Sequence, residues 1–182
     1  MANIDFTPIK TVYNGYLFKS KLEAKWAVFF DRIGIGYQYE PEAFAVEGGW
    51  YTPDFYLPDV YLRSNEESGV YIEVKPTQWR YNNTTKEYVE KITKAMSGAT
   101  LILFNGEPYD FCDYGYRNDD GGYQLQPYYD NCMILVYCSH CNIMKVEFAE
   151  GNYMYCEACN GPRCVDTLLS ASIQARQFHF KH

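Results

Sequence analysis

Two cysteine pairs toward the C-terminal end constrain the fold of this chain more than any other sequence feature. The first pair is Cys138 and Cys141, the second is Cys156 and Cys159, and fourteen residues separate the pairs. Each Cys-x-x-Cys pair is typical of a tight turn that presents two thiolates, and four thiolates complete the tetrahedral ligand set of zinc. We therefore expect a zinc ribbon held by these four cysteines.

Other roles for the cysteines are less consistent with the spacing. A thioredoxin-type redox motif would need a βαβ context around Cys138 and Cys141, and it leaves the second pair without a role. Cys164 is an alternative ligand, and His140 is expected to be a turn residue. Because four thiolates leave zinc no open position for a substrate, the expected ion is structural.

The composition is typical of a globular cytoplasmic protein. The 182 residues are 47% hydrophobic and 18% aromatic, which suffices for a sizeable core and excludes an acidic disordered chain. No apolar run approaches the roughly eighteen residues of a transmembrane helix. The segment Met1–Asp5 lacks the basic and apolar parts of a signal peptide. We therefore expect no membrane association and a cytoplasmic location.

The charge is unevenly distributed along the chain. A formal net charge of −7 argues against bulk attraction to nucleic acid. However, segments 9–32 and 75–94 each hold five basic and two acidic residues, whereas 105–131 holds one basic and six acidic residues. A basic surface beside an acidic loop is therefore compatible with the sequence, although such segments are also typical of an ordinary solvated surface.

The periodicity of the first half predicts a compact α/β domain that ends near residue 110. Asn14-Gly15 is typical of a hairpin turn within 11–18, and a capping-box pattern at Ser20 predicts a helix that ends at Gly34. The remaining expected elements are short strands in 37–60 broken by Pro41, Gly48-Gly49, Pro53 and Pro58, a strand over 70–75, a helix over 84–96, a strand over 100–104, a connecting loop or hairpin over 105–131 and a helix from Val165 to about Phe178.

The strand over 70–75 places two charged residues on one face. With a period of two, Val70, Ile72 and Val74 point to one side, while Glu73 and Lys75 point to the other. If the segment around Asp54 pairs with this strand, the carboxylates of Asp54 and Glu73 converge. A divalent cation would relieve their repulsion, and the ammonium group of Lys75 could hold a water or stabilise a phosphate.

The same residues carry a resemblance to a known family. Pro53-Asp54, eighteen intervening residues and then Glu73-Val74-Lys75 resemble the PD-(D/E)XK motif of the restriction-endonuclease-like nuclease superfamily. Glu23 lies where that family usually places a helical glutamate. The likeness covers roughly residues 10–105, and it is closest to small phage and prophage nucleases, including those similar to Holliday-junction resolvases and transposon end-cleaving subunits.

The resemblance implies a function and a set of site residues. Asp54, Glu73 and the Val74 carbonyl would bind Mg²⁺ (or Mn²⁺), and Lys75 would position or activate the attacking water. Glu23 would help to bind or orient the metal or its waters; alternatively, as the last residue of a capping box, it would accept only from the Ser20 backbone amide. The reaction implied is in-line hydrolysis of a DNA phosphodiester bond inside a host cell. A homodimer would allow cuts in both strands.

The predicted organisation has three parts. A restriction-endonuclease-like mixed sheet flanked by helices occupies 1–110, an acidic aromatic connecting loop occupies 111–131, and a zinc ribbon with the C-terminal helix occupies 132–182. The alternative to an endonuclease is a non-catalytic nucleic-acid-binding or protein-interaction module on the same fold. Duplex DNA, branched DNA, single strands and RNA all stay open as substrates, because base readout depends on loops without a legible pattern.

Overall fold

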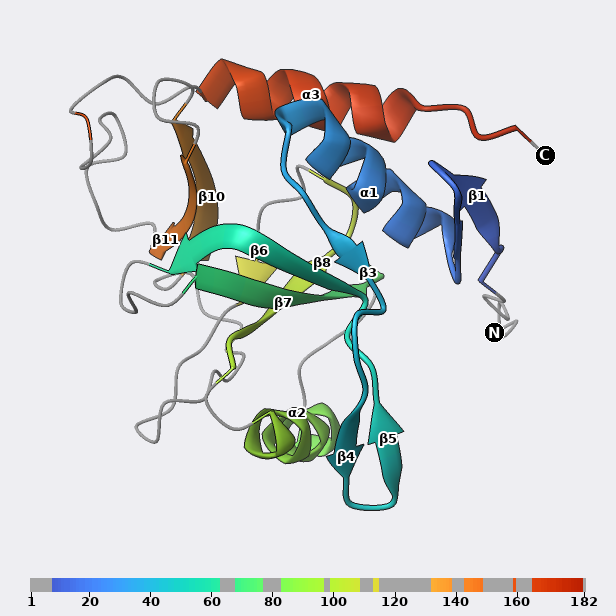
Figure 1. The fold of residues 1–182 in the computed structure, drawn as a ribbon, viewed down its shortest axis with the longest axis vertical. Coiled ribbons are helices and arrows are strands. Elements are labelled where there is room, and N and C mark those ends of the chain that lie inside the picture. The colour runs from blue at the N-terminus through green and yellow to red at the C-terminus, as the bar shows by residue number, and fades with distance from the viewer. Residues whose placement is uncertain are drawn as a thin grey trace.

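A computed structural model gives the fold of the chain as mixed α/β (Figure 1). The residues that it describes are 8–62, 68–76, 83–96, 99–108, 113–114, 132–138, 143–148, 159 and 165–181. Three helices lie within these ranges, and none of them has the length and apolar character needed to cross a bilayer.

The N-terminal hairpin and the first helix form where the sequence predicts them. Strands β1 (Thr11–Tyr13) and β2 (Tyr16–Phe18) pair across the Asn14-Gly15 turn. Helix α1 (Lys21–Ile33) begins after Ser20, whose hydroxyl oxygen accepts from the Glu23 amide at 3.1 Å. It ends at Gly34, whose φ of 73° is a left-handed conformation that glycine adopts without strain.

The later elements give a mixed sheet and a separate small hairpin. In chain order they are β3 (Gln38–Tyr39), β4 (Phe44–Val46), β5 (Gly49–Tyr51), β6 (Phe55–Leu62), β7 (Ser68–Lys75), α2 (Asn83–Ala95), β8 (Leu101–Asn105), β9 (Asp113–Tyr114), β10 (Cys132–Cys138), β11 (Ile143–Phe148) and α3 (Val165–Gln177). The sheet order is β11-β10-β9-β8-β7-β6-β3, with β6 and β7 antiparallel and β7 and β8 parallel. Strands β4 and β5 pair only with each other.

The predicted break at Pro58 is wrong. Strand β6 continues through this residue, and its register against β7 shifts between Leu57 and Tyr61. A proline has no N–H to give to a ladder, so it is tolerated where regular pairing is already interrupted.

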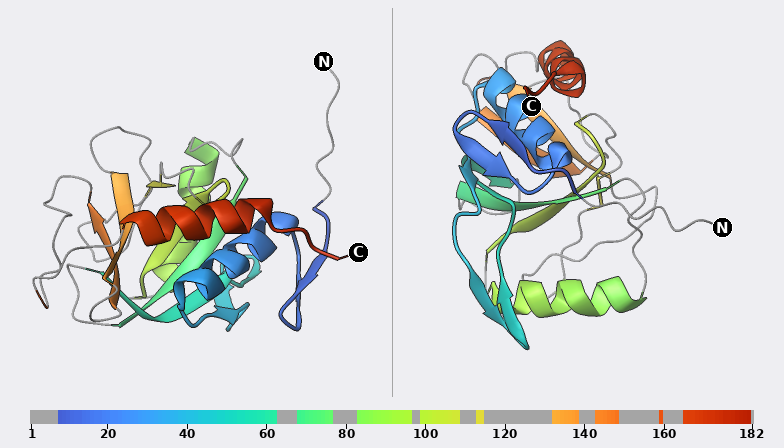
Figure 2. Two further views of the ribbon diagram at one scale, coloured as in Figure 1. Left: turned by 90° about the horizontal axis from the view of Figure 1, so that it is seen from above. Right: turned by 90° about the vertical axis from the view of Figure 1, so that its right-hand side faces the viewer.

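Helices cover both faces of the sheet (Figures 1 and 2). Helices α1 and α3 lie on one face, where Phe29, Phe30, Phe55 and Ile72 are among the fully buried residues of the main core. Helix α2 and the β4–β5 hairpin lie on the other face, over a smaller cluster that includes Tyr51. The two faces of β7 therefore meet different environments.

Trp26 of α1 connects the main core to the end of β8. Its ring stacks on Phe104 with centroids 4.2 Å apart, and its Nε1 donates to the Gly106 carbonyl at 2.9 Å. The Gly106 amide in turn donates to the carbonyl of Lys75 at 2.8 Å. Burial of an aromatic side chain of this kind contributes about 2–3 kcal/mol, so the C-terminal end of β7 is firmly held.

The described part of 132–182 packs with the rest of the chain. Strand β10 pairs with β9, and β11 pairs with both β10 and β6. In α3, Ala171 and Ala175 belong to the main core. Cys138 is the last residue of β10 and Cys159 lies in a turn, whereas Cys141 and Cys156 lie outside the described residues. The zinc ribbon stays a prediction.

Candidate active site

The pairing of β6 with β7 brings Asp54 beside the Glu73-Val74-Lys75 segment. Phe55 lies opposite Ile72 in the antiparallel register, so Asp54, just before β6, lies beside the end of β7. One carboxylate oxygen of Asp54, Oδ2, accepts the backbone N–H of Val74 at 2.7 Å. Because Val74 gives its amide to this side chain, the position of Asp54 is fixed between the two charged residues of β7.

Glu73 is a buried carboxylate with two donors. Its side chain points to the α2 face, and only 8% of the residue is exposed. Its Oε2 accepts from the hydroxyl of Tyr51 at 2.8 Å, and its Oε1 accepts from the ammonium of Lys75 at 2.5 Å. Residues i and i+2 of a strand share a face, which explains the contact between Glu73 and Lys75.

Burial and neighbouring charges raise the pKa of Asp54 to about 8. Loss of solvation is the largest cause, followed by the negative charges of Glu73 and Glu23; the Val74 amide and the Lys75 charge oppose the shift. Without a cation, the Asp54 carboxyl therefore retains a proton near neutral pH.

For Lys75, in contrast to Asp54, the surroundings favour the charged form. Burial alone would lower the pKa of its ammonium group, but the charge and hydrogen bond of Glu73 outweigh burial, and the pKa is raised. Lys75 is therefore a cation and a hydrogen-bond donor at neutral pH, rather than a base.

Glu23 lies in the first turn of α1 and is 7% exposed. Its Oε2 accepts from the Tyr39 hydroxyl at 2.7 Å and from the Lys19 amide at 3.1 Å, and its Oε1 accepts from the Ser20 hydroxyl at 2.6 Å. The side chain therefore caps the helix start through these groups, and not through the Ser20 backbone amide that a full capping box would use. Its charge also contributes to the raised pKa of Asp54.

Three tyrosines of the site have no counterpart in the sequence prediction. Tyr39 holds Glu23, and Tyr51 holds Glu73. Tyr88 of α2 packs edge-on against Tyr51 with centroids 6.4 Å apart, and 48% of it is exposed. Tyr51 precedes Asp54 by three residues, but nothing in the sequence distinguishes it among nineteen tyrosines.

The donor set fits a small hard cation. When Asp54 is ionised, it carries together with Glu73 and Glu23 more negative charge than Lys75 alone can balance, and carboxylate oxygens are the ligands that Mg²⁺ prefers. Within the described ranges, no group of three or more His, Cys, Asp or Glu side chains lies so that it could hold a metal ion, so Glu23 does not form one ligand group with Asp54 and Glu73. A group of three is not required for Mg²⁺, because this ion usually keeps several waters and takes one or two carboxylates. The role of the Val74 carbonyl as a metal ligand stays a prediction.

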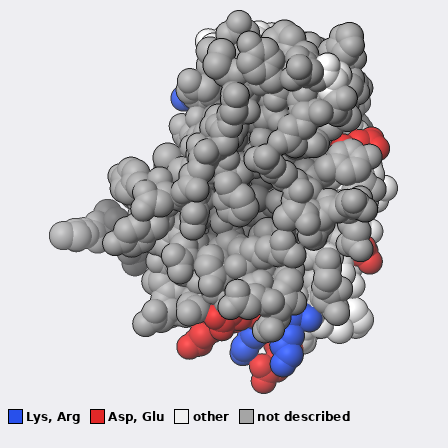
Figure 3. All heavy atoms as spheres, turned by 90° about the vertical axis from the view of Figure 1, so that its left-hand side faces the viewer, with Lys and Arg blue, Asp and Glu red and all other residues white. Residues whose placement is uncertain are grey.

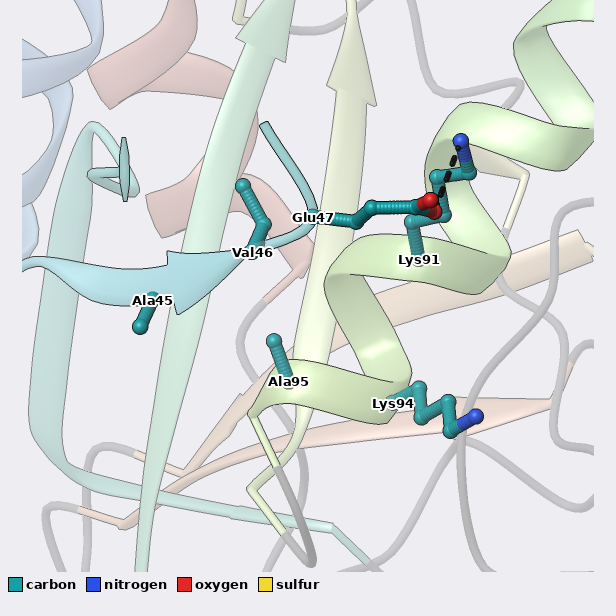
Figure 4. A pocket seen from close by; sticks show the side chains of 6 residues that line it. All are labelled: Ala45, Val46, Glu47, Lys91, Lys94 and Ala95. Carbon is teal, nitrogen blue, oxygen red and sulfur yellow. Dashed lines mark ion pairs between the residues drawn. The ribbon is translucent and has the colours of Figure 1, made fainter. Parts of the chain in front are cut away.

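A shallow hollow of about 470 Å³ lies between the β4–β5 hairpin and α2 (Figure 4). Glu47 reaches from the hairpin toward Lys91, with 3.2 Å between the charged atoms, whereas Lys94 points away. Acidic and basic side chains adjoin one another at this edge of the molecule (Figure 3). The charges around the hollow are mixed. None of the residues Glu23, Asp54, Glu73 and Lys75, which we call the acidic site, lines it, so we assign no function to the hollow.

Comparisons with family models, with curated proteins and with solved structures found no match to this chain. A function must therefore be inferred from the residues themselves and their geometry.

Proposed function

We propose that this protein is a metal-dependent endonuclease that hydrolyses phosphodiester bonds of DNA. The observation that carries the proposal is the position of half-buried Asp54, hydrogen-bonded to the backbone of β7 between Glu73 and Lys75. Two carboxylates and one lysine on adjoining strands are the side chains that the PD-(D/E)XK resemblance requires. We include the restriction-endonuclease-like fold in the same proposal.

Each residue has a distinct part in the proposed reaction. Asp54 and Glu73, with the Val74 carbonyl, would hold Mg²⁺ or Mn²⁺, and Glu23 would add negative charge beside them. When bound, the ion stabilises charge that develops on the phosphate and lowers the pKa of the attacking water. The ammonium of Lys75 donates hydrogen bonds to that water or to the phosphate. Tyr51 keeps Glu73 oriented.

The proposal includes a structural zinc ion on Cys138, Cys141, Cys156 and Cys159. Cys138 is paired with Ile143 at the ends of β10 and β11, so the first cysteine pair begins where these two strands connect. This placement is consistent with a zinc-binding turn at the end of a hairpin. The ion would stabilise the fold and take no part in hydrolysis.

The test is a cleavage assay on plasmid, single-stranded DNA, branched DNA and RNA. Mg²⁺ is omitted rather than chelated in the control reaction, so that structural zinc stays bound. We expect Mg²⁺-dependent cleavage that Lys75→Met reduces by a factor on the order of 100 or more. The matched control is Lys21→Met, which removes an exposed lysine from the start of α1.

Two results would contradict the proposal. One is that the wild-type protein cleaves none of the substrates with Mg²⁺ or Mn²⁺; retained DNA binding in that case would indicate the non-catalytic module. The other is that Lys75→Met cleaves as fast as Lys21→Met, which would place the chemistry elsewhere in the chain.

A further inference from the structure

Lys19 is the residue before the cap of α1, and its backbone is anchored to the acidic site. Its amide N–H donates to Glu23 Oε2 at 3.1 Å and to the Tyr39 hydroxyl oxygen at 2.9 Å. The Tyr39 hydroxyl in turn donates to the same Glu23 oxygen at 2.7 Å. These three bonds fix the start of the Lys19 side chain next to Glu23.

The side chain of Lys19 extends to the surface and is 61% exposed. Its ammonium forms an ion pair with the carboxylate of Glu40. The Glu40 backbone is itself attached to the site, because its N–H donates to the carbonyl of Asp54 at 2.9 Å. Glu40 has a φ of 46°, a left-handed conformation that a non-glycine residue adopts at some energetic cost. The surrounding structure therefore holds Glu40 in place, and Glu40 holds Lys19.

The position of Lys19 differs from that of Lys75. Lys75 is half-buried, with 20% of its side chain exposed, and is paired with Glu73, whereas the side chain of Lys19 is exposed to water. The pKa of Lys19 is raised, mainly by the hydrogen bond to Glu40 and also by the charges of Asp54 and Glu23. Lys19 is thus an exposed cation within electrostatic reach of both carboxylates.

An exposed ion pair is a weak restraint on a lysine side chain. Solvent screens the attraction between Lys19 and Glu40, so exchange of the Glu40 carboxylate for another anion has little net cost. A nucleic-acid strand that enters the site brings phosphates at regular intervals along its backbone. The phosphate next to the scissile one would therefore meet an ammonium group already held near the carboxylates.

We propose that Lys19 binds a backbone phosphate of the nucleic acid adjacent to the scissile phosphate, and that Glu40 holds the Lys19 side chain until the strand arrives. This inference rests on the proposed nuclease function and adds a substrate-binding subsite to it. A lysine contributes a point charge to phosphate recognition, so the contact carries no base specificity.

The test measures binding of a labelled DNA duplex in Ca²⁺, a hard cation that also takes oxygen ligands and replaces Mg²⁺ here. Lys19→Ala is compared with Lys21→Ala, which removes the same charge two residues further along. We expect Lys19→Ala to weaken binding several-fold and to reduce the slope of log affinity against log salt concentration by about 0.9, the value for one phosphate contact. Lys21→Ala should keep the wild-type affinity and slope.

A second pair of variants tests the part of Glu40. Glu40→Gln keeps the backbone bond to Asp54 and removes the charge that holds Lys19, so we expect tighter DNA binding. Glu42→Gln removes an equal charge two residues away and should tighten binding less. The Mn²⁺ affinity of Lys19→Ala should not fall below that of the wild type, because the subsite acts on the nucleic acid and the substitution removes a positive charge near the carboxylates.

The outcomes separate this inference from the proposed function. If the wild-type protein cleaves DNA but Lys19→Ala matches Lys21→Ala in affinity and salt slope, the Lys19 subsite is wrong and the nuclease stands. If the wild-type protein neither binds nor cleaves DNA, the proposed function fails, and this inference fails with it. A loss of Mn²⁺ affinity in Lys19→Ala would also overturn it, since the residue would then act on the metal site.

Discussion

At the scale of single residues, the carboxylates of the proposed active site repel one another unless a proton or a cation neutralises part of their charge. Asp54 is half-buried beside Glu73 and within reach of the Glu23 charge, and its pKa rises to about 8 as a result. A proton and a divalent cation are alternative ways to relieve this repulsion, so they compete for the same carboxylate. The metal site proposed here should therefore bind more tightly as pH rises toward 8.

The raised pKa predicts a specific effect of pH on stability without added Mg²⁺. The folded state binds the Asp54 proton more tightly than the unfolded chain, where the pKa is near its ordinary value of 3.8. The stabilising contribution of this proton is therefore complete below about pH 4 and is lost as pH rises to about 8. Asp54→Asn keeps an acceptor for the Val74 amide and carries no charge, so its unfolding free energy should not show this loss.

Urea unfolding between pH 4 and 9 measures the difference between wild type and variant. The variant should gain stability relative to the wild type across this range. Parallel curves for the two proteins would contradict the electrostatic account of Asp54.

The sequence predicted that Asp54, Glu73 and Lys75 lie close together, but not which groups hold them in place. Strand alternation decides the face of β7 that Glu73 and Lys75 share, and the pairing of β6 with β7 brings Asp54 beside them. Tyr39 and Tyr51 are donors to Glu23 and Glu73 through tertiary contacts, which leave no spacing in the sequence. A prediction from sequence could only find such donors once the sheet register was known.

At the scale of elements, the start of β7 depends on a close contact between the backbone of Gly69 and the side chain of Tyr56. Gly69 has a φ of 99°, and a Cβ at this residue would lie 2.1 Å from the hydroxyl oxygen and 2.7 Å from the Cζ atom of Tyr56. Only glycine adopts this positive φ without strain, and only a residue without a Cβ leaves the Tyr56 ring where it is. The start of β7 thus depends on a residue that lacks a side chain.

We predict that Gly69→Ala lowers the free energy of unfolding by about 1–3 kcal/mol, from backbone strain and the displaced Tyr56 ring. The matched control is Gly36→Ala, whose added Cβ would meet Asp59 Oδ2 at an ordinary 3.8 Å. Urea denaturation gives both values. Equal effects of the two substitutions would show that the Tyr56 contact carries no strain.

The strength of local signals explains which elements the sequence could predict. Helix α1 has a cap at Ser20, a left-handed glycine at its end and an apolar face, and each signal indicates the same boundaries. For β6, the local signal of Pro58 was misleading, because the register shift against β7 accommodates the proline. A break in pairing is a property of two strands, and the sequence of one strand does not contain it.

At the scale of the whole molecule, the C-terminal segment is part of one folded structure in the described residues. Strand β11 pairs with β6, and α3 packs on α1 in the main core. Arg176 of α3 also lies 3.5 Å from Glu107, which forms a second ion pair with Lys25 of α1. Sequence patterns located the strands and helices but not these contacts, since pairing between distant segments has no local signature.

These contacts predict the effect of deletion of residues 132–182. The shortened chain loses partners of β6 and α1 and should fail to fold, whereas an independent first domain would remain stable. Circular dichroism of the truncated chain measures this directly. For the full chain, calorimetry should give a single unfolding transition, which shifts to lower temperature when zinc is removed. A folded truncated chain with the thermal stability of the full protein would contradict this prediction.

Calorimetric titration of Mn²⁺ at pH 8 into zinc-loaded protein tests the central claim most directly, because the claim is that Asp54 and Glu73 hold a divalent cation. We predict that the wild-type protein binds Mn²⁺ and that Asp54→Asn loses this binding while its circular dichroism spectrum is unchanged. Equal Mn²⁺ binding by the two proteins, or no binding by the wild type, would contradict the metal site and the nuclease function built on it.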